Sequence, residues 1–239
     1  MPLPIVDIVD FLKNTLSLKD QQHLDLGLSH LEFESGNISL YETVCLCSII
    51  KVMEPKLVME FGTFNGRTTI NIAHNLPTDG RIITVDLPIQ NKTVGTIAKL
   101  KTKFKLADGR TDPNDELGFV GKSKFFENHV YKASGRIQQV WSDTAMLDPN
   151  HIEWKDKVDL FFIDASHTYE NCYNDSFIAY EIIKKYGIII WHDYNGWPGV
   201  TKALDQIDSK LNKVIKINQI KDTSLAVGMV MSKEGMDLW

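Results

Sequence analysis

The chain has 239 residues, of which 43% are hydrophobic and 24% charged, and its net charge is −5 at neutral pH. This ordinary globular composition excludes collagen-like, low-complexity and wholly disordered chains. The acidic balance, without any basic stripe, argues against a nucleic-acid partner. No apolar run approaches the roughly 20 residues of a membrane span. The N-terminus has no basic, signal-like start, so we expect no membrane partner and a cytoplasmic location.

The first predicted elements along the chain are helices. Apolar residues at helical spacing predict an amphipathic helix over residues 4–16. Ser39 and Glu42 have the spacing of a capping box, which predicts a second helix from Ser39 to about residue 53. Three cysteines, an odd number, indicate reduced and buried thiols rather than disulfides.

From residue 56 onwards, short apolar strands alternate with helices. Such an alternation is typical of a parallel sheet covered by helices on both faces. A short connection joins the last two strands, which indicates an antiparallel hairpin. The predicted strands cover residues 56–61, 81–86, 137–141, 158–164, 187–192, 214–217 and 225–231, and the helices between them cover residues 66–75, 169–185 and 198–211.

We interpret the whole chain, residues 1–239, as a single domain. Residues 1–54 form a helical N-terminal extension of this domain. Residues 90–135 break the alternation, because the segment is long, polar and rich in glycine, lysine and aspartate. We expect this segment to be a variable insertion or flap rather than a second domain.

The loop after the first strand of the alternation has the pattern of a nucleoside site. Its sequence is Glu60-Phe-Gly62-Thr63-Phe-Asn-Gly66, and glycines at such a turn let the backbone approach a ligand. Glu60 disfavours a pyrophosphate there and favours a ligand with a cationic amino group. Asp86 ends the next strand, where a carboxylate can accept both ribose hydroxyls. These residues together predict a site for a ribose-bearing, positively charged ligand.

A second group of polar residues follows the two apolar strands at 158–164 and 187–192. The group consists of Asp164, His167, His192 and Asp193. Because ligands bind at the carboxyl ends of the strands in an open parallel sheet, we expect these side chains to converge beside the nucleoside site. A buried acid is costly unless it is paired or bound to a metal. Two carboxylates with imidazoles suit a divalent cation.

The strand-end motifs resemble motifs I and II of the class I S-adenosylmethionine (SAM) methyltransferases. The resemblance implies a Rossmann-like α/β fold with a seven-stranded, mostly parallel sheet, helices on both faces and strand 7 antiparallel, in the strand order 3-2-1-4-5-7-6. It also implies SAM as the cofactor, with the adenine held after the third strand. The implied cofactor-binding residues are Glu60, Gly62, Thr63, Gly66, Asp86, Ser142, Asp143, Thr144 and Asp164.

The ends of the fourth and fifth strands resemble the metal-dependent small-molecule O-methyltransferases, nearest the macrocin-type and other sugar-modifying branch. By this resemblance Asp164 and Asp193 are metal ligands, and His167 is the general base. His192 stands where that branch often has a carboxylate, and it is implied as the third ligand. The implied cofactors are therefore SAM and a divalent cation, Mg²⁺ or Mn²⁺, and the imidazole favours Mn²⁺ or a later metal.

The predicted function is SAM-dependent O-methylation of a small molecule, with a sugar or glycoside as acceptor and a homodimer suggested by relatives. An imidazole titrates near pH 6.5, whereas an aliphatic hydroxyl is close to water, with a pKa of about 15.7. We therefore expect a metal and His167 to act together. Tyr169, Tyr194 and Trp197 are candidates for the wall of the acceptor pocket.

Two alternatives stay open. One is a catechol-like phenol as the acceptor, and the other is a catalytically silent SAM-binding protein. An amino-group methyltransferase is disfavoured, because the fourth strand ends in Asp-Ala-Ser-His rather than in an Asn/Asp-Pro-Pro-aromatic motif.

Overall fold

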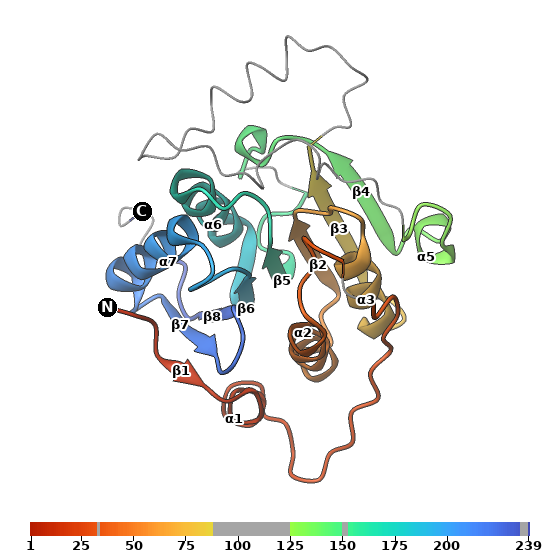
Figure 1. Ribbon diagram of the computed structural model, residues 1–239, viewed down its shortest axis with the longest axis horizontal. Coiled ribbons are helices and arrows are strands. Elements are labelled where there is room, and N and C mark those ends of the chain that lie inside the picture. The colour runs from red at the N-terminus through yellow and green to blue at the C-terminus, as the bar shows by residue number, and fades with distance from the viewer. Residues whose placement is uncertain (33, 88–124, 150–152, 235–238) are drawn as a thin grey trace.

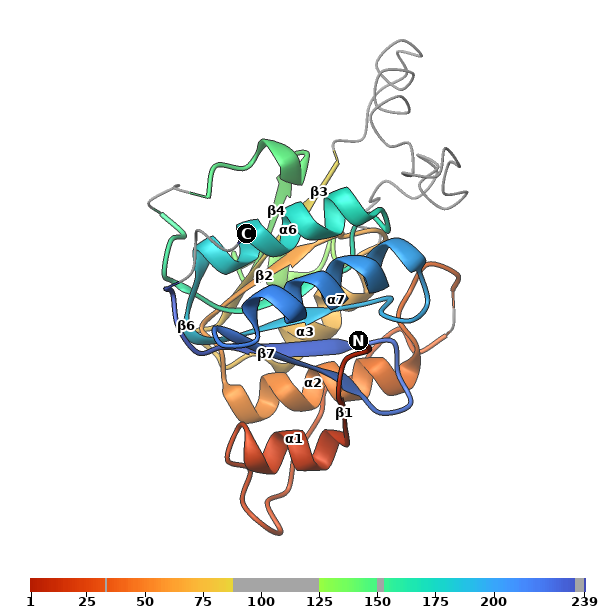
Figure 2. The same ribbon diagram turned by 90° about the vertical axis from the view of Figure 1, so that its left-hand side faces the viewer.

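The structure is a computed structural model that describes residues 1–32, 34–87, 125–149, 153–234 and 239. One sheet crosses the molecule and carries helices on both faces (Figures 1 and 2). Its strands are β1 (Ile5–Val6), β2 (Leu57–Phe61), β3 (Arg81–Asp86), β4 (Ile137–Trp141), β5 (Val158–Ile163), β6 (Ile183–Trp191), β7 (Ile215–Ile220) and β8 (Ala226–Val230). The helices are α1 (Ile8–Asn14), α2 (Leu40–Met53), α3 (Arg67–Asn75), α5 (Val130–Ala133), α6 (Tyr169–Ile182) and α7 (Pro198–Leu211), with a 3-10 turn, η2, at Thr144–Met146.

The strand order is β1-β7-β8-β6-β5-β2-β3-β4. All neighbouring strands are parallel except the two pairs that involve β8, which runs antiparallel to both β6 and β7. Without β1, the order is the 3-2-1-4-5-7-6 arrangement with an antiparallel seventh strand. The predicted Rossmann-like fold class is confirmed, and β1 adds an eighth, two-residue strand at one edge.

The N-terminal helix is shorter than the predicted span of residues 4–16. Ile5 and Val6 pair with β7 instead, and Gln219 N donates to the carbonyl oxygen of Pro4. The helix begins only at Ile8, because the Asp7 side chain caps it by accepting from Val9 N. The backbone of β7 thus offers hydrogen-bond partners to residues 4–6. A helix that began at residue 4 would leave these groups of β7 without those partners.

The second helix has the predicted capping box. Ser39 Oγ accepts from Glu42 N at 3.2 Å, and Glu42 Oε2 accepts from Ser39 N at 2.8 Å. The helix predicted over residues 169–185 ends at Ile182, because Ile183 is extended and already pairs with Val158 of β5.

The core consists of two layers, one on each face of the sheet. Phe61, Phe161 and Trp191 pack in the layer with α6 and α7, whereas Leu160 and Ile190 pack in the layer with α2 and α3. In Figure 2, α6 and α7 lie on one side of the sheet and α2 on the other. The three cysteines are buried and unpaired, as predicted. In the part of the chain that the structure describes, no helix is long and apolar enough to cross a membrane.

The predicted insertion, residues 90–135, falls mostly outside the described residues. Its last part, from residue 125 on, is described and includes α5. Phe126 in this part is fully buried in the layer with α2 and α3. The division of the chain into a core, an N-terminal extension and an insertion stays a prediction.

Candidate functional site

The parallel strands β2 to β6 end at one edge of the sheet (Figure 1), and the predicted site residues end these strands or follow them in the sequence. Hydrogen bonds across this edge hold the loops together: Gly62 N donates to the Val85 carbonyl, and Asp164 N donates to the Phe61 carbonyl. Farther along the same edge, His192 N donates to the Ile163 carbonyl. The sheet therefore fixes the starting point of each site loop.

Glu60 is fully buried at the end of β2, beneath the glycine loop. Its Oε2 accepts hydrogen bonds from the hydroxyls of Thr69 and Thr84, each at 2.5 Å. Among the described residues no group donates to its Oε1. Burial raises the pKa of Glu60 to about 8, although the two threonines lower it, and the charges of Asp164 and Asp86 raise it further. A buried carboxylate oxygen of this kind favours a cationic hydrogen-bond donor as its partner.

Thr63 belongs to the same hydroxyl network. Its Oγ1 lies 2.6 Å from Thr84 Oγ1 and accepts from Gln139 Nε2 at 3.1 Å. Thr63 is 2% exposed, so in this structure its side chain supports Glu60 through Thr84 rather than facing solvent.

Gly62 is required by the close approach of two strand ends. Its φ is +96°, and a Cβ there would lie 1.9 Å from the carbonyl oxygen of Asp164. The loop after β2 and the loop after β5 can touch only because this side chain is missing. Gly62 thereby sets the distance between Glu60 and Asp164.

Gly62→Ala is expected to destabilise the protein by about 2–5 kcal/mol, the sum of left-handed strain and a backbone clash. Gly135→Ala is the matched control, because Gly135 also has a positive φ, +77°, but a Cβ there would meet nothing within 4 Å. Gly135→Ala should lower the free energy of unfolding by only about 1–2 kcal/mol, the cost of left-handed strain alone. Denaturant unfolding measures the free energy of unfolding of both variants. Equal losses of stability would contradict the close approach of Gly62 to the Asp164 carbonyl.

Gly66 lies at the N-cap of α3 with a φ of +84°. A Cβ at this position would lie 2.5 Å from Cδ1 of Phe126. Phe125 N also donates to the Asn65 carbonyl at 3.1 Å. The space next to Gly66 is therefore filled by the described end of the predicted insertion, and the predicted cofactor contact at Gly66 stays a prediction.

Asp86 ends β3 beside the glycine loop, as predicted. Its Oδ2 accepts from Phe64 N at 2.8 Å, and its Oδ1 accepts from Leu87 N at 2.7 Å. Asp86 thus lies at the place predicted for it, and its contact with the ribose hydroxyls stays a prediction. Phe64 has a φ of +48°, a strained backbone conformation that clusters at ligand sites.

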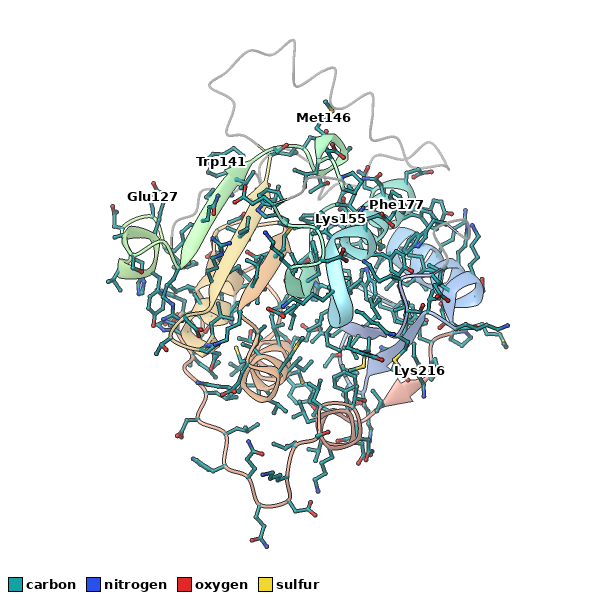
Figure 3. All side chains as sticks on the ribbon, turned by 180° about the vertical axis from the view of Figure 1, so that it is seen from behind. Glu127, Trp141, Met146, Lys155, Phe177 and Lys216 are labelled. Carbon is teal, nitrogen blue, oxygen red and sulfur yellow. The ribbon has the colours of Figure 1, made fainter. Side chains whose placement is uncertain are left out.

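The predicted adenine residues form a turn after β4. Ser142 N donates to the Asp86 carbonyl, which ties this turn to the ribose side of the site. Asp143 caps η2 by accepting from Ala145 N at 2.9 Å, and Thr144 is the first residue of η2. Figure 3 shows Trp141 and Met146 on either side of this turn; they are 41% and 74% exposed. Exposed apolar side chains of this size suit a flat heterocycle.

Asp164, Asp193 and His192 form the half of the site that follows β5 and β6. His192 Nδ1 lies 3.1 Å from Asp164 Oδ1 and 3.2 Å from Asp193 Oδ1. His192 Nε2 lies 3.5 Å from Glu42 Oε2. Burial alone would lower the pKa of His192, but the three carboxylates raise it well above 6.5. The imidazole thus bridges three acids.

Asp193 is held between two imidazoles. Besides His192, it meets His167, whose Nε2 lies 2.8 Å from Asp193 Oδ2. Burial would raise the pKa of Asp193, but hydrogen bonds with His167 and His192 hold it well below its usual range. Its φ is +66°, a conformation that costs about 1–3 kcal/mol and is concentrated at functional sites.

The donor set at this edge fits a divalent cation. In the described part of the chain, ligand atoms of Asp164, His167 and Asp193 all lie within 4.8 Å of one another. The same three residues line a cavity of about 10 Å³, roughly the room for one water-sized particle, with Cys172, Trp191 and Val200 among its other walls. Two carboxylates suit Mg²⁺ or Mn²⁺, and an imidazole as a further ligand would favour Mn²⁺ or a later metal. His192, the third ligand implied by the resemblance, has its Nδ1 within 3.2 Å of both carboxylates, and its role as a ligand stays a prediction.

Glu42 is a site residue that the sequence interpretation missed. Its Oε1 accepts from the amide and hydroxyl of Ser224, and its Oε2 meets Ser39 and His192. The hydrogen bonds lower its pKa, against the effect of burial. The capping-box pattern explained Glu42 locally, and no sequence signal pointed to a partner 150 residues away.

Two of the three aromatic candidates lie near the cluster. The ring of Trp197 stacks on His167, and Tyr169 is the first residue of α6, directly after the His167 loop. Tyr194 is fully buried: its hydroxyl accepts from Leu3 N and donates to Asp205 Oδ1, both at 2.8 Å. The expectation that Tyr194 lines an acceptor pocket is therefore wrong, because it anchors the N-terminus.

In a comparison with known protein families, the matched residues include this site. A family model described as a methyltransferase domain matches residues 59–194, more than half of the chain. The chain belongs to this methyltransferase domain family. The match includes the glycine loop and the ends of β5 and β6, so the predicted enzyme class, a methyltransferase, is confirmed.

Solved structures share the fold of this methyltransferase. An O-methyltransferase from Bacillus cereus, in complex with S-adenosylhomocysteine (SAH), is 15% identical with a TM-score of 0.54, covering 95% of this chain and 98% of that chain. An SAH-bound methyltransferase from Podospora anserina is 13% identical with a TM-score of 0.54, covering 82% and 80%. No curated protein matches the chain.

Proposed function

We propose that this methyltransferase transfers the methyl group of SAM to a hydroxyl of a small molecule, with a sugar or glycoside as the acceptor. The observation that carries the proposal is the cluster of Asp164, His167 and Asp193, directly beside the glycine loop of the family. A methyltransferase that acts on an aliphatic hydroxyl needs both a base and a positive charge near the oxygen. The SAH-bound O-methyltransferase that shares the fold supports the same reaction type.

The cofactor side of the site would be formed by Glu60 and Asp86. Oε1 of Glu60 would meet the amino group of SAM, and Asp86 would accept from the ribose hydroxyls. Asp143 and Thr144 would hold the adenine, where Met146 and Trp141 are exposed. Asp164 lies between this half and the cation-binding half, because its backbone touches the loop at Gly62.

The acceptor side would be formed by Asp164, His167 and Asp193. Asp164 and Asp193 would hold a divalent cation, and His192 Nδ1, which lies close to one oxygen of each, would keep the two carboxylates together. When bound, the cation supplies a positive charge that lowers the pKa of an acceptor hydroxyl. His167 would accept the proton of that hydroxyl at Nδ1, because its Nε2 faces Asp193 Oδ2, which orients the ring. The remaining task of the chain is to align the hydroxyl with the methyl group and to exclude water.

The transfer itself is tested by incubating the protein with SAM, Mn²⁺ and a panel of sugars, glycosides and catechols, and by measuring SAH formation. SAH formation that depends on a sugar or glycoside supports the proposal. Turnover with catechols alone would show that the acceptor is a phenol and not a sugar or glycoside. Tight SAH binding without turnover of any compound in the panel would favour a catalytically silent SAM-binding protein.

SAH is expected to raise the melting temperature of the wild type by mass action, and Glu60→Gln and Asp86→Asn are expected to lose most of this shift. Because the amino group of SAH pairs best with an ionised carboxylate, the shift should grow from about pH 6.5 to about pH 8.5. Glu60, whose pKa is about 8, changes from mostly protonated to mostly ionised within this pH range. The growth should be absent in Glu60→Gln.

The ligand-free protein provides the control for folding. A carboxyl whose pKa is raised on folding stabilises the protein fully below about 4.5, and this stabilisation is lost as the pH rises through about 8. Ligand-free Glu60→Gln should therefore be more stable than the wild type above that pH. A full SAH shift in Glu60→Gln, or a larger shift of the wild type with NADH, would contradict the proposed cofactor site.

A further inference from the structure

The first turn of α7 lies directly against the loop that carries His167. Trp197 is the N-cap residue of α7, and its ring stacks on the ring of His167 with centroids 4.6 Å apart and planes 10° apart. At its edge, the same imidazole meets Asp193 Oδ2 at 2.8 Å. The His167 ring is thus held on one face by an indole and at one nitrogen by a carboxylate.

Gly199 makes this contact sterically possible. A Cβ at this position would lie 2.3 Å from the carbonyl oxygen of His167 and 2.8 Å from the amide nitrogen of Tyr169. Both are backbone atoms, which cannot rotate away as the end of a side chain can. A methyl group at position 199 would therefore push α7 away from residues 167–169, and Trp197 would move with it.

We propose that Trp197 and Gly199 are positioning residues that set the orientation of the His167 imidazole. The expected effect on turnover rests on the proposed function, whereas the orientation of the ring does not. His167 follows β5 in a loop, outside any helix or strand, so its backbone alone does not fix the ring. The contact with the first turn of α7 supplies the missing constraint, because a reacting group must be held within a fraction of an ångström.

The chain contains a matched pair of glycines for the test. Gly196 lies three residues before Gly199, and a Cβ at Gly196 would have its nearest neighbour, the Asp193 carbonyl oxygen, at an ordinary contact distance of 3.5 Å. We expect Gly199→Ala to lower turnover about 10- to 100-fold, with SAH affinity within about twofold of the wild type. Gly196→Ala should stay within about twofold of the wild type in both. Trp197→Leu should resemble Gly199→Ala, and Trp197→Phe, which keeps a flat ring, should recover most of the loss.

A spectroscopic measurement tests the orientation without any methyl transfer. In a ¹H–¹³C spectrum of the histidine rings, the Cε1–H signal of His167 is identified by its loss in His167→Asn. The stacked indole gives this signal a ring-current shift. We expect the shift to change in Gly199→Ala and Trp197→Leu and to persist in Gly196→Ala.

The two measurements separate this proposal from the proposed function. If the wild type methylates no acceptor, the spectra still decide whether Gly199 and Trp197 hold the ring. An unchanged His167 signal in Trp197→Leu, or wild-type turnover of Gly199→Ala, would overturn the proposal. The proposal would also be overturned if Trp197→Leu lost as much SAH affinity as turnover, because the substitution would then disturb the whole site and not only the His167 ring. Trp197→Leu creates no backbone clash, so the test stands even if Gly199→Ala fails to fold.

Discussion

Replacing His167 with alanine is expected to lower turnover roughly 10²–10⁴-fold while leaving SAH affinity close to that of the wild type. His167 Nε2 lies beside Asp193 Oδ2, in the half of the site that follows β5 and β6. The proposed SAH-binding carboxylates, Glu60 and Asp86, belong to β2 and β3. Steady-state rates of SAH formation and calorimetric titration with SAH measure the two effects separately.

Mn²⁺ affinity distinguishes a base from a ligand at position 167. If His167 is the base, His167→Ala should bind Mn²⁺ within a few-fold of the wild type. A loss as large as that of Asp164→Asn would instead make His167 a ligand, as its place in the cluster also permits. An active His167→Asn enzyme would remove the imidazole from the mechanism altogether, because asparagine keeps only a side-chain hydrogen bond.

Removal of the cation is also expected to have a large effect on methyl transfer. Chelation is expected to suppress methyl transfer, and added Mn²⁺ is expected to restore it. Asp164→Asn and Asp193→Asn should each weaken Mn²⁺ binding at least about tenfold, because each removes an anionic oxygen that would bind the ion. Water-proton relaxation measures Mn²⁺ binding without any acceptor.

Asp205→Asn is the matched control for these variants. It makes the same change in charge on α7, outside the cluster, and its Oδ1 can still accept from the Tyr194 hydroxyl. Its Mn²⁺ affinity and turnover should equal those of the wild type. Full activity of the wild type in excess chelator would contradict a role for the cation.

The strand ends of the site could be predicted from sequence, because a parallel sheet brings them together by its topology. Glu60, Asp86, Asp164 and His192 each follow or end an apolar strand, and the carboxyl ends of these strands share one edge. Local sequence and chain order are sufficient for that conclusion. The same applies to the antiparallel hairpin of β7 and β8, which a short connection determines.

Contacts between distant segments could not be predicted in this way. Glu42 reaches His192 from α2, and Phe126 fills the space beside Gly66 from within the predicted insertion. Tyr194 follows the site strand but points into the core toward Leu3. Each of these contacts depends on packing between layers of the fold, which periodicity and motif spacing do not encode.

The role of His192 shows the same limit. Its position matches a metal-ligating carboxylate in the resembling family, yet its Nδ1 faces the carboxylates of Asp164 and Asp193. The three acids around His192 raise its pKa above the usual range, so in this structure the ring pairs with carboxylates, and its implied role as the third metal ligand stays a prediction. The identity of a residue in a motif therefore does not settle its role when its neighbours differ.

A crystal structure of the protein with SAH and Mn²⁺ would show both halves of the proposed site at once. We expect the SAH amino group at Oε1 of Glu60, its ribose at Asp86, and Mn²⁺ bound by Asp164 and Asp193, with the SAH sulfur facing the ion and His167. SAH bound away from Glu60 and Asp86 would overturn the proposed cofactor site, and no ion at Asp164 and Asp193 in crystals grown with Mn²⁺ would overturn the proposed metal site.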